Sequence, residues 1–120
     1  MLMIKKWYKK IKDSIELKKS NWGRDYNWYI EYDGQLIGEL VAYEFWDMFW
    51  DSYIIKSLDK KWDQLLTKPK YWNDFKFKNQ HYKQYAMNAF AEGKAYDSGV
   101  TLNQRITFRG LYLIEINGNV

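Results

Sequence analysis

Asp33-Gly34 restricts the fold of this chain more than any other feature, because it joins two runs of strand-forming residues. The runs span residues 25–32 and 35–45, and both are rich in aromatic and aliphatic side chains. An Asp-Gly pair between two such runs is the strongest local signal for a two-residue type I′ hairpin, since both residues tolerate the positive φ angles of that turn. The sequence therefore predicts an antiparallel hairpin here.

The faces of this hairpin follow from its expected register. A two-residue turn brings Tyr32 opposite Gln35 and Ile30 opposite Ile37, and side chains alternate between the two faces along each strand. One face then carries Trp28, Ile30, Ile37 and Val41, and the other carries Tyr29, Leu36 and Leu40. Because both faces are apolar, alternation leaves open which of them is buried.

The N-terminal stretch predicts a helix over residues 3–19. Its bulky apolar side chains recur with helical spacing and its lysines occupy the other faces, the apolar stripe being Ile4, Trp7, Tyr8, Ile11 and Ile15. A basic amphipathic helix can lie on a membrane, but packing of the stripe on a sheet is much commoner. We therefore expect the stripe to be buried, and we expect no membrane partner.

The remaining residues predict further strands and helices. Strands are expected at 49–58, around 75–77 and from Val100 to Ile116, and helices at 60–67, capped by Asp59 and stopped by Pro69, and at 82–90. Gly110 invites a bulge in the last strand. The prediction is a single α+β domain over residues 1–120, with an antiparallel sheet of four to six strands and two or three packed helices.

Charge is distributed unevenly along the chain. Residues 25–55 hold seven acidic and no basic side chains, and they also hold ten of the 24 aromatic residues. The flanking segments are basic, so the net charge is +4. Aromatic side chains with an acidic rim are typical of a surface that recognises a basic protein partner. The alternative is that these aromatic residues form the core while the acids face the first helix.

The candidate partner-binding residues lie within residues 43–53, which contain three carboxylates and no basic side chain. Aromatic anchors and charged contacts are expected from one set, namely Glu44, Trp46, Asp47, Phe49, Trp50, Asp51 and Tyr53.

Catalytic and cofactor chemistry finds little support in the sequence. The chain has no cysteine, and His81 is its only histidine, which we expect to be exposed at a helix start. The glycines form no phosphate-binding motif. Asp47 and Asp51, four residues apart, are expected to lie on one side of either a helix or a strand, where they could serve a hydrolase or a hard cation. The expectation is nevertheless a non-enzyme with no cofactor and no metal.

A second binding function stays open. Arg105 and Arg109 lie on the last predicted strand near Phe108 and Tyr112, and sheets with basic and aromatic side chains often hold single-stranded nucleic acid. The acidic hairpin would repel a phosphate chain, so nucleic-acid binding is the alternative hypothesis to protein binding.

Localisation and size complete the expectations. Lysines interrupt the N-terminal apolar residues, whereas a secretion signal needs a continuous apolar region. No apolar run reaches the length of about 20 residues that a membrane span requires. A cytoplasmic protein is therefore expected. In size and in its Lys-, Asn- and Ile-rich composition, the chain resembles the small bacterial immunity proteins. Its net positive charge departs from the acidic character of many nuclease inhibitors, so the class of toxin stays open. That resemblance implies a domain that neutralises a cognate toxin by binding it.

Overall fold

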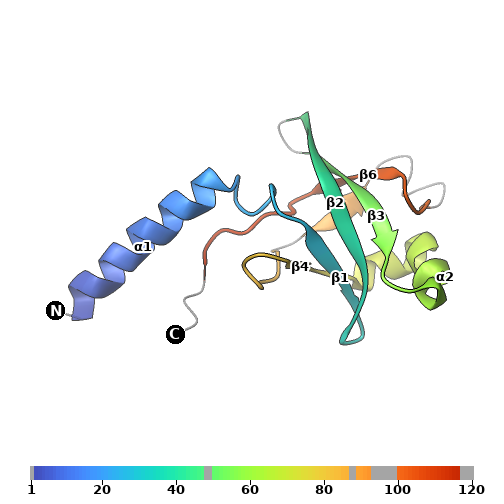
Figure 1. Cartoon of the computed structure of the whole chain (residues 1–120), viewed down its shortest axis with the longest axis horizontal. Helices are drawn as coiled ribbons and strands as arrows, with labels where there is room; N and C mark the ends of the chain where they lie inside the picture. Colours follow the sequence, from blue (N-terminus) through green and yellow to red (C-terminus); the bar gives the residue numbers. More distant parts are fainter. Residues whose placement is uncertain (1, 48–49, 87–88, 93–99, 117–120) are drawn as a thin grey trace.

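The computed structural model describes residues 2–47, 50–86, 89–92 and 100–116, and it defines only the backbone for residues 2–6, 46–47 and 90–92. Figure 1 traces the chain from one end to the other. In chain order the elements are α1 (Leu2–Lys19), β1 (Trp28–Tyr32), β2 (Gln35–Asp47), β3 (Trp50–Ser57), η1 (Lys60–Trp62), α2 (Asp63–Thr67), η2 (Pro69–Asp74), β4 (Lys76–Asn79), β5 (Phe90–Glu92) and β6 (Arg105–Arg109).

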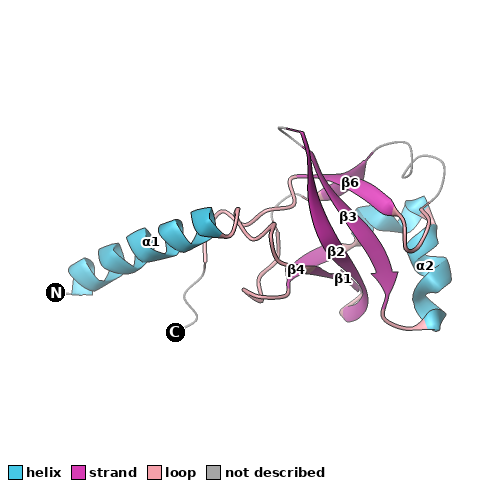
Figure 2. Ribbon diagram, turned by 45° about the horizontal axis from the view of Figure 1, so that its top comes forward, coloured by secondary structure: helices cyan, strands magenta, loops and turns pink. Residues whose placement is uncertain are grey.

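The strands form one antiparallel sheet in the order β4-β1-β2-β3-β6-β5. The sheet together with the helices confirms the predicted α+β class, and its strand number lies within the predicted range. Most neighbouring strands are also neighbours in sequence, as expected for a sheet built from hairpins. Figure 2 shows α2 beside the sheet, whereas α1 extends away from it.

The sheet is strongly curled. The rings of Phe77 on β4 and Phe108 on β6 lie 5.3 Å apart between centroids, although β1, β2 and β3 separate these two strands. In a flat sheet four strand spacings would separate them by about 19 Å. Trp72 of η2 packs on both rings, at 6.2 and 5.9 Å. The inner face therefore wraps around one aromatic core that η2 closes.

The core comes from the inner face of the sheet and from the segment that follows β3. Fully buried side chains of the sheet include Trp28, Ile30, Leu40, Tyr53, Ile55 and Phe108. Leu66 of α2 is buried against β2 at Gly38, where an added Cβ would lie 3.1 Å from Leu66 Cδ1 and 3.0 Å from the Lys56 carbonyl oxygen. Glycine at this position thus allows α2 to approach the sheet closely.

The predicted register of the first hairpin holds only next to its turn. Tyr32 pairs with Gln35 as expected, but Ile30 pairs with Gly38 instead of Ile37. The register shifts between Ile30 and Glu31, so Ile37 is an extra residue in β2. As a result Leu40 is buried together with Ile37, whereas the sequence placed these two side chains on opposite faces.

Helix α1 forms where predicted, but its stripe does not pack on the sheet. The exposed fractions of Trp7, Tyr8, Ile11 and Ile15 are 65%, 66%, 40% and 50%. Among the described side chains of the helix, only Leu17 is buried. The expectation of a buried stripe is therefore wrong, because apolar periodicity reports the shape of the helix and not the presence of a surface for it to cover.

The helix predicted over residues 82–90 is also absent from the described part of that segment. Asn79 is fully buried, and its Oδ1 accepts hydrogen bonds from the backbone N–H groups of His81 and Tyr82 at 3.0 and 2.9 Å. The chain then runs back along β4, with the Ala86 N–H donating to the Phe77 carbonyl. A buried asparagine that caps a tight turn thus overrides the helical spacing.

Other predictions agree more closely with the structure. Asp59 accepts a hydrogen bond from the Lys61 N–H and starts the short helical segment η1–α2, as predicted. Pro69 ends α2 but also begins η2. The last strand, β6, is shorter at both ends than the predicted 100–116. The expected bulge at Gly110 within it is wrong, because Gly110 adopts a φ of +77° directly after Arg109 and lies outside the strand.

Candidate functional site

The described candidate residues lie on β2 and β3, which pair as a hairpin that protrudes from the sheet (Figure 1). Glu44 pairs with Ser52, Phe45 with Asp51 and Asp47 with Trp50. The pairing is irregular on both sides of Glu44, and Ala42 in the first irregularity has a φ of +56°. Bulges of this kind twist a hairpin and redirect its side chains.

Three described side chains near the end of the hairpin are exposed or partly exposed to solvent. The Glu44 side chain is 63% exposed, Phe45 is 70% exposed and Trp50 is half-buried. Among the large apolar side chains that the structure describes, Phe45 has the highest exposed fraction. An exposed phenylalanine on a protruding hairpin is a feature of binding surfaces. We call Glu44, Phe45 and Trp50 the hairpin surface.

Phe45 was not among the candidate residues, and strand alternation would not have selected it. Tyr43 and Trp46 close to it in the sequence are also aromatic, so hydrophobicity alone does not distinguish Phe45. The irregularities in β2 decide its orientation, and they depend on pairing with β3. The only local signal is its position near the turn of a long hairpin.

Arg105 of β6 fixes the outer side of this hairpin. Its guanidinium donates to the Ala42 carbonyl at 2.8 Å and forms an ion pair with Glu44 at 3.1 Å. It also reaches Ser52 Oγ at 3.4 Å. One arginine thus joins the bulge in β2 to β3, and it neutralises part of the charge of Glu44.

Two candidate residues lie inside the protein instead of on its surface. Tyr53 is fully buried, and Asp51 is 4% exposed. Neither side chain can touch a partner that docks on this folded form, so we remove both from the predicted set. Their inward position arises because β3 is covered on that face by the aromatic core and by the loop after α1.

Asp51 and Tyr53 belong to a buried polar network that ties this loop to the sheet. Asp51 forms an ion pair with Arg24 at 2.9 Å, although the arginine Nε lacks the alignment of a hydrogen bond. Tyr53 Oη accepts a hydrogen bond from Trp28 Nε1 and donates one to the Arg24 carbonyl, at 3.1 and 3.0 Å. The hairpin is therefore supported from behind by residues far apart in sequence.

The pKa values of this network follow from burial. Loss of solvation raises the pKa of Asp51, while the positive charge of Arg24 and the hydroxyl of Tyr43 act in the opposite direction. Desolvation also raises the pKa of Tyr43, and the neighbouring Asp51 charge adds to that rise. For Tyr53 the pKa rises strongly, again mainly through burial. Both tyrosines thus stay protonated at neutral pH as hydrogen-bond donors.

The expectation that Asp47 and Asp51 lie on one side of a single helix or strand is wrong. Asp47 lies on β2 and Asp51 on β3, so the chain reverses its direction between them. The four-residue spacing therefore does not place them on one side of a continuous element. The side chains of Trp46 and Asp47 are not described, and Phe49 lies outside the described residues, so these three residues stay predictions.

The described residues give no support to a catalytic histidine, a metal site or a membrane-spanning helix. His81 is exposed as expected, but in a turn, with its ring stacked on Tyr26 at 4.1 Å. Within the described ranges no three acidic, histidine or cysteine side chains are grouped as metal ligands. Over the same residues, no helix has the length and apolar character needed to cross a bilayer.

The residues expected to bind single-stranded nucleic acid also have partners within the protein. Arg105 holds the β2 bulge and Glu44, while Phe108 is fully buried. The Tyr112 ring lies under the Arg24 guanidinium, at 4.9 Å. Arg109 is exposed but also has an interaction of its own. The described part of this strand thus lacks an open aromatic platform on which bases could stack.

Comparison with known proteins gives no relative: no family model matches the chain, and no curated protein or solved structure matches it either. The functional argument therefore uses the residues of the chain itself. Among the described residues, β2 and β3 form a hairpin that Arg105 and Arg24 hold through polar contacts and that exposes Phe45 and Glu44.

Proposed function

We propose that this chain is a non-enzymatic protein-binding domain of the bacterial immunity type, which acts in the cytoplasm and neutralises a toxin by docking on it. The partner would be a basic protein, held by the hairpin surface. The observation that carries the proposal is Phe45, 70% exposed at the end of a protruding hairpin beside the exposed Glu44.

The contacts that hold the hairpin in place support the proposal that its exposed side chains form a binding surface. Arg105 fixes the outer side through Ala42 and Glu44, and the Arg24–Asp51 ion pair fixes the inner side. A surface that is ordered before it binds loses less conformational entropy when it does so. An aromatic side chain in such a position is a typical hot spot, whose truncation costs about 2 kcal/mol or more in binding.

The test uses the protein as bait in an extract of the source organism. The unchanged protein and a Leu36→Ala control should retain the same partner, since Leu36 is also exposed but lies at the other end of β2. Phe45→Ala should weaken binding of that purified partner about 30-fold. Glu44→Lys should slow association with a basic partner, and added salt should reduce this defect.

Toxin neutralisation is tested separately. The retained partner should arrest growth when expressed alone and not when expressed with the unchanged protein. A partner that binds Phe45→Ala and Glu44→Lys as tightly as the unchanged protein would exclude the hairpin surface. A partner without toxicity would exclude the immunity function and leave a binding domain.

Single-stranded nucleic acid remains the alternative ligand, with less support because Arg105 and Phe108 are engaged within the fold. A gel-shift titration at low salt against single-stranded RNA and DNA tests it. Binding that falls steeply with salt and is weakened by Arg109→Ala would favour this alternative.

A further inference from the structure

Helix α1 presents an apolar stripe that the described chain leaves uncovered. Trp7 and Tyr8 are about two thirds exposed, and Ile11 and Ile15 are about half exposed. These four side chains lie along one stripe of the helix, because they are three and four residues apart. We call them the α1 stripe. Exposed apolar side chains on a single stripe mark a surface for docking on something else.

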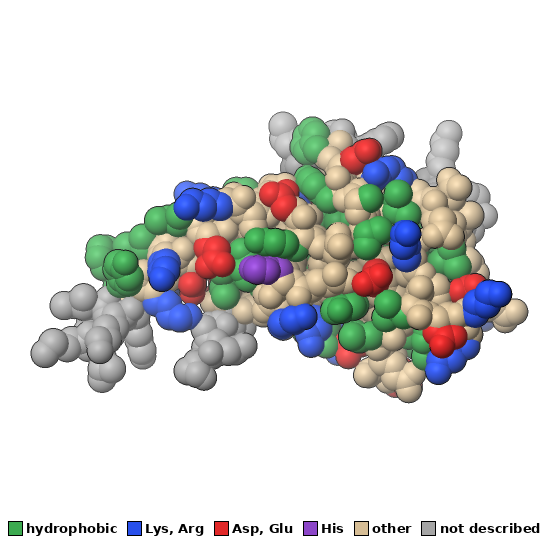
Figure 3. All heavy atoms as spheres, in the orientation of Figure 1, with side chains coloured by type: hydrophobic (Ala, Val, Ile, Leu, Met, Phe, Trp, Pro, Cys, Tyr) green, Lys and Arg blue, Asp and Glu red, His purple; other side chains and the backbone are tan. Residues whose placement is uncertain are grey.

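Lysines surround this stripe. The side chains of Lys9, Lys10 and Lys12 are exposed, and Lys5 and Lys6 precede them in the same helix. The first acidic residue is Asp13, which pairs with Lys9 at 3.2 Å. Residues 2–12 of α1 therefore carry five lysines and no acidic residue, and on the described part of the helix apolar and basic side chains lie beside one another (Figure 3).

The helix is placed where a broad surface could reach it. It extends away from the sheet along the longest axis of the molecule, whose principal extents are 54, 31 and 20 Å (Figure 1). Within the described chain, α1 has no extensive packing with any strand or other helix. Among the described residues, none has to move for another surface to reach the stripe.

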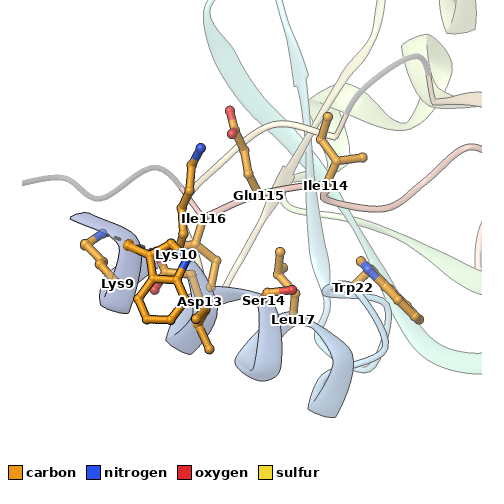
Figure 4. Close-up of a pocket in the computed structure, with 11 residues that line it drawn as sticks. Lys9, Lys10, Asp13, Ser14, Leu17, Trp22, Ile114, Glu115 and Ile116 are labelled. Carbon is orange, nitrogen blue, oxygen red and sulfur yellow. Dashed lines mark hydrogen bonds and ion pairs between the residues drawn. The ribbon is translucent and has the colours of Figure 1, made fainter. Parts of the chain in front are cut away.

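A groove of about 640 Å³ extends this apolar surface toward the C-terminal segment. Trp7 and Ile11 line it from the helix. Ile114 and Ile116, labelled in Figure 4, line it from the C-terminal segment. Ile114 is 54% exposed. The Leu113 N–H donates to the Trp22 carbonyl, which holds this segment beside the end of α1.

We propose that α1 lies in the plane of an anionic phospholipid surface, with its stripe in the interfacial region and its lysines among the headgroups. A basic helix with tryptophan and aliphatic side chains on one stripe has the composition of an interfacial helix. Tryptophan and tyrosine are favoured at the boundary between headgroups and acyl chains, because their rings are apolar with one polar group. Clustered lysines supply the attraction to acidic headgroups.

This proposal differs from the sequence expectation, which excluded a membrane partner because it expected the stripe to be buried. It is also independent of the hairpin surface, which lies on β2 and β3 away from α1 (Figure 2). A protein bound to lipid through α1 would keep that hairpin free for a partner. Failure of one proposal therefore leaves the other untouched.

Flotation with lipid vesicles tests the proposal on the full chain. The protein should float with vesicles of phosphatidylcholine and phosphatidylglycerol, but not with phosphatidylcholine alone, and added salt should weaken the binding. Tyr8→Gln with Ile15→Gln should reduce the partition coefficient at least about tenfold. Lys9→Gln, Lys10→Gln and Lys12→Gln together should reduce it by about fivefold per lysine.

Matched controls separate α1 from general charge and general apolarity. Lys60→Gln, Lys68→Gln and Lys76→Gln remove the same charge from exposed positions outside α1. Leu36→Gln with Leu58→Gln removes two exposed leucines, also outside α1. Both control proteins should float like the unchanged protein. Circular dichroism identifies any variant that has lost the helix. For such a variant flotation is not interpreted, and the fluorescence measurement described next tests the proposal instead.

Fluorescence quenching tests insertion without disturbing binding. Vesicles with brominated acyl chains should quench part of the tryptophan emission of the unchanged protein. Trp7→Phe should keep flotation and lose that quenched part, because Trp7 is the tryptophan on the stripe.

Three outcomes would overturn the proposal. The first is absence of flotation with anionic vesicles, and the second is equal loss of flotation in the α1 variants and in their controls. The third is a dimer in solution that Tyr8→Gln with Ile15→Gln dissociates while vesicles leave the protein unbound. That result would assign the stripe to a second copy of the chain.

Discussion

Asp51 carries its carboxylate in the interior, where desolvation raises its pKa in spite of the Arg24 ion pair. A group with a higher pKa in the folded chain than in the unfolded chain binds its proton more tightly when folded. Its stabilising contribution is therefore complete below the unfolded pKa. It is lost as the pH rises through the raised pKa of the folded state.

Asp51→Asn removes this titration. Relative to the unchanged protein, the variant should gain free energy of unfolding as the pH rises from about 3 to 7, since only the unchanged protein must bury an ionised carboxylate. Urea unfolding of both proteins across this range measures the difference. A difference that does not change with pH would show that Asp51 titrates alike in the folded and unfolded chains.

Tyr53→Phe tests the buried hydrogen-bond network. The change removes the hydroxyl that accepts from Trp28 and donates to Arg24, and it leaves a buried indole N–H and a carbonyl without that partner. The free energy of unfolding should fall by about 2 kcal/mol. In the control, Tyr32→Phe, the ring that packs on Tyr71 and Phe75 is kept, so denaturant unfolding should show a much smaller loss.

At the scale of single elements, β2 contains the irregularities that shape the candidate site. Ala42 adopts a φ of +56° although it is not glycine. This conformation costs an alanine about 1 kcal/mol, because its Cβ approaches the following carbonyl. The Arg105 hydrogen bond to the Ala42 carbonyl helps to hold it.

Ala42→Gly should relieve that cost. Ala42 is exposed, so its methyl group adds little packing. The free energy of unfolding should rise by about 0.5 kcal/mol, since the greater freedom of glycine in the unfolded chain offsets part of the gain. Ala86→Gly is the control, because Ala86 has an ordinary φ and is half-buried, and that variant should be destabilised. Equal losses in both variants would contradict the argument.

The elements also show how far the sequence could predict the site. Strands were predicted at 35–45 and 49–58, and the candidate set taken from residues 43–53 includes Glu44 and Trp50, which are exposed and half-buried. The bulges were not predicted, because an extra residue in one strand is defined only by its partner strand. For that reason Phe45 was missed, while Asp51 and Tyr53 were assigned to a surface that they do not reach.

At the scale of the whole molecule, α1 contributes little to holding the sheet together. Its described side chains before Leu17 are all exposed or half-buried, whereas Leu17 and Ser20 are buried. Most buried side chains lie in the curled sheet and in the segments packed on it, so we expect these elements to provide most of the stability. Burial therefore does not account for the apolar stripe of α1.

Deletion of residues 2–14 tests this division. The shortened chain should unfold cooperatively in urea, with a free energy of unfolding within about 1 kcal/mol of the full chain, because exposed side chains contribute little to stability. Extending the deletion through Ser20 should cost about 3 kcal/mol more, since it removes the buried Leu17. A large loss from the shorter deletion would show that α1 stabilises the fold.

The sequence by itself determined the class of elements and most of their positions. Local features of the sequence set the local backbone conformation. Examples are the Asp33-Gly34 turn, the helical spacing of α1 and the cap at Asp59. Only the tertiary structure decided which surfaces are covered. Burial depends on the bulges, on the curl that joins Phe77 to Phe108, and on the loop that brings Arg24 to Asp51. These are contacts between distant residues, and no periodicity along the chain encodes them.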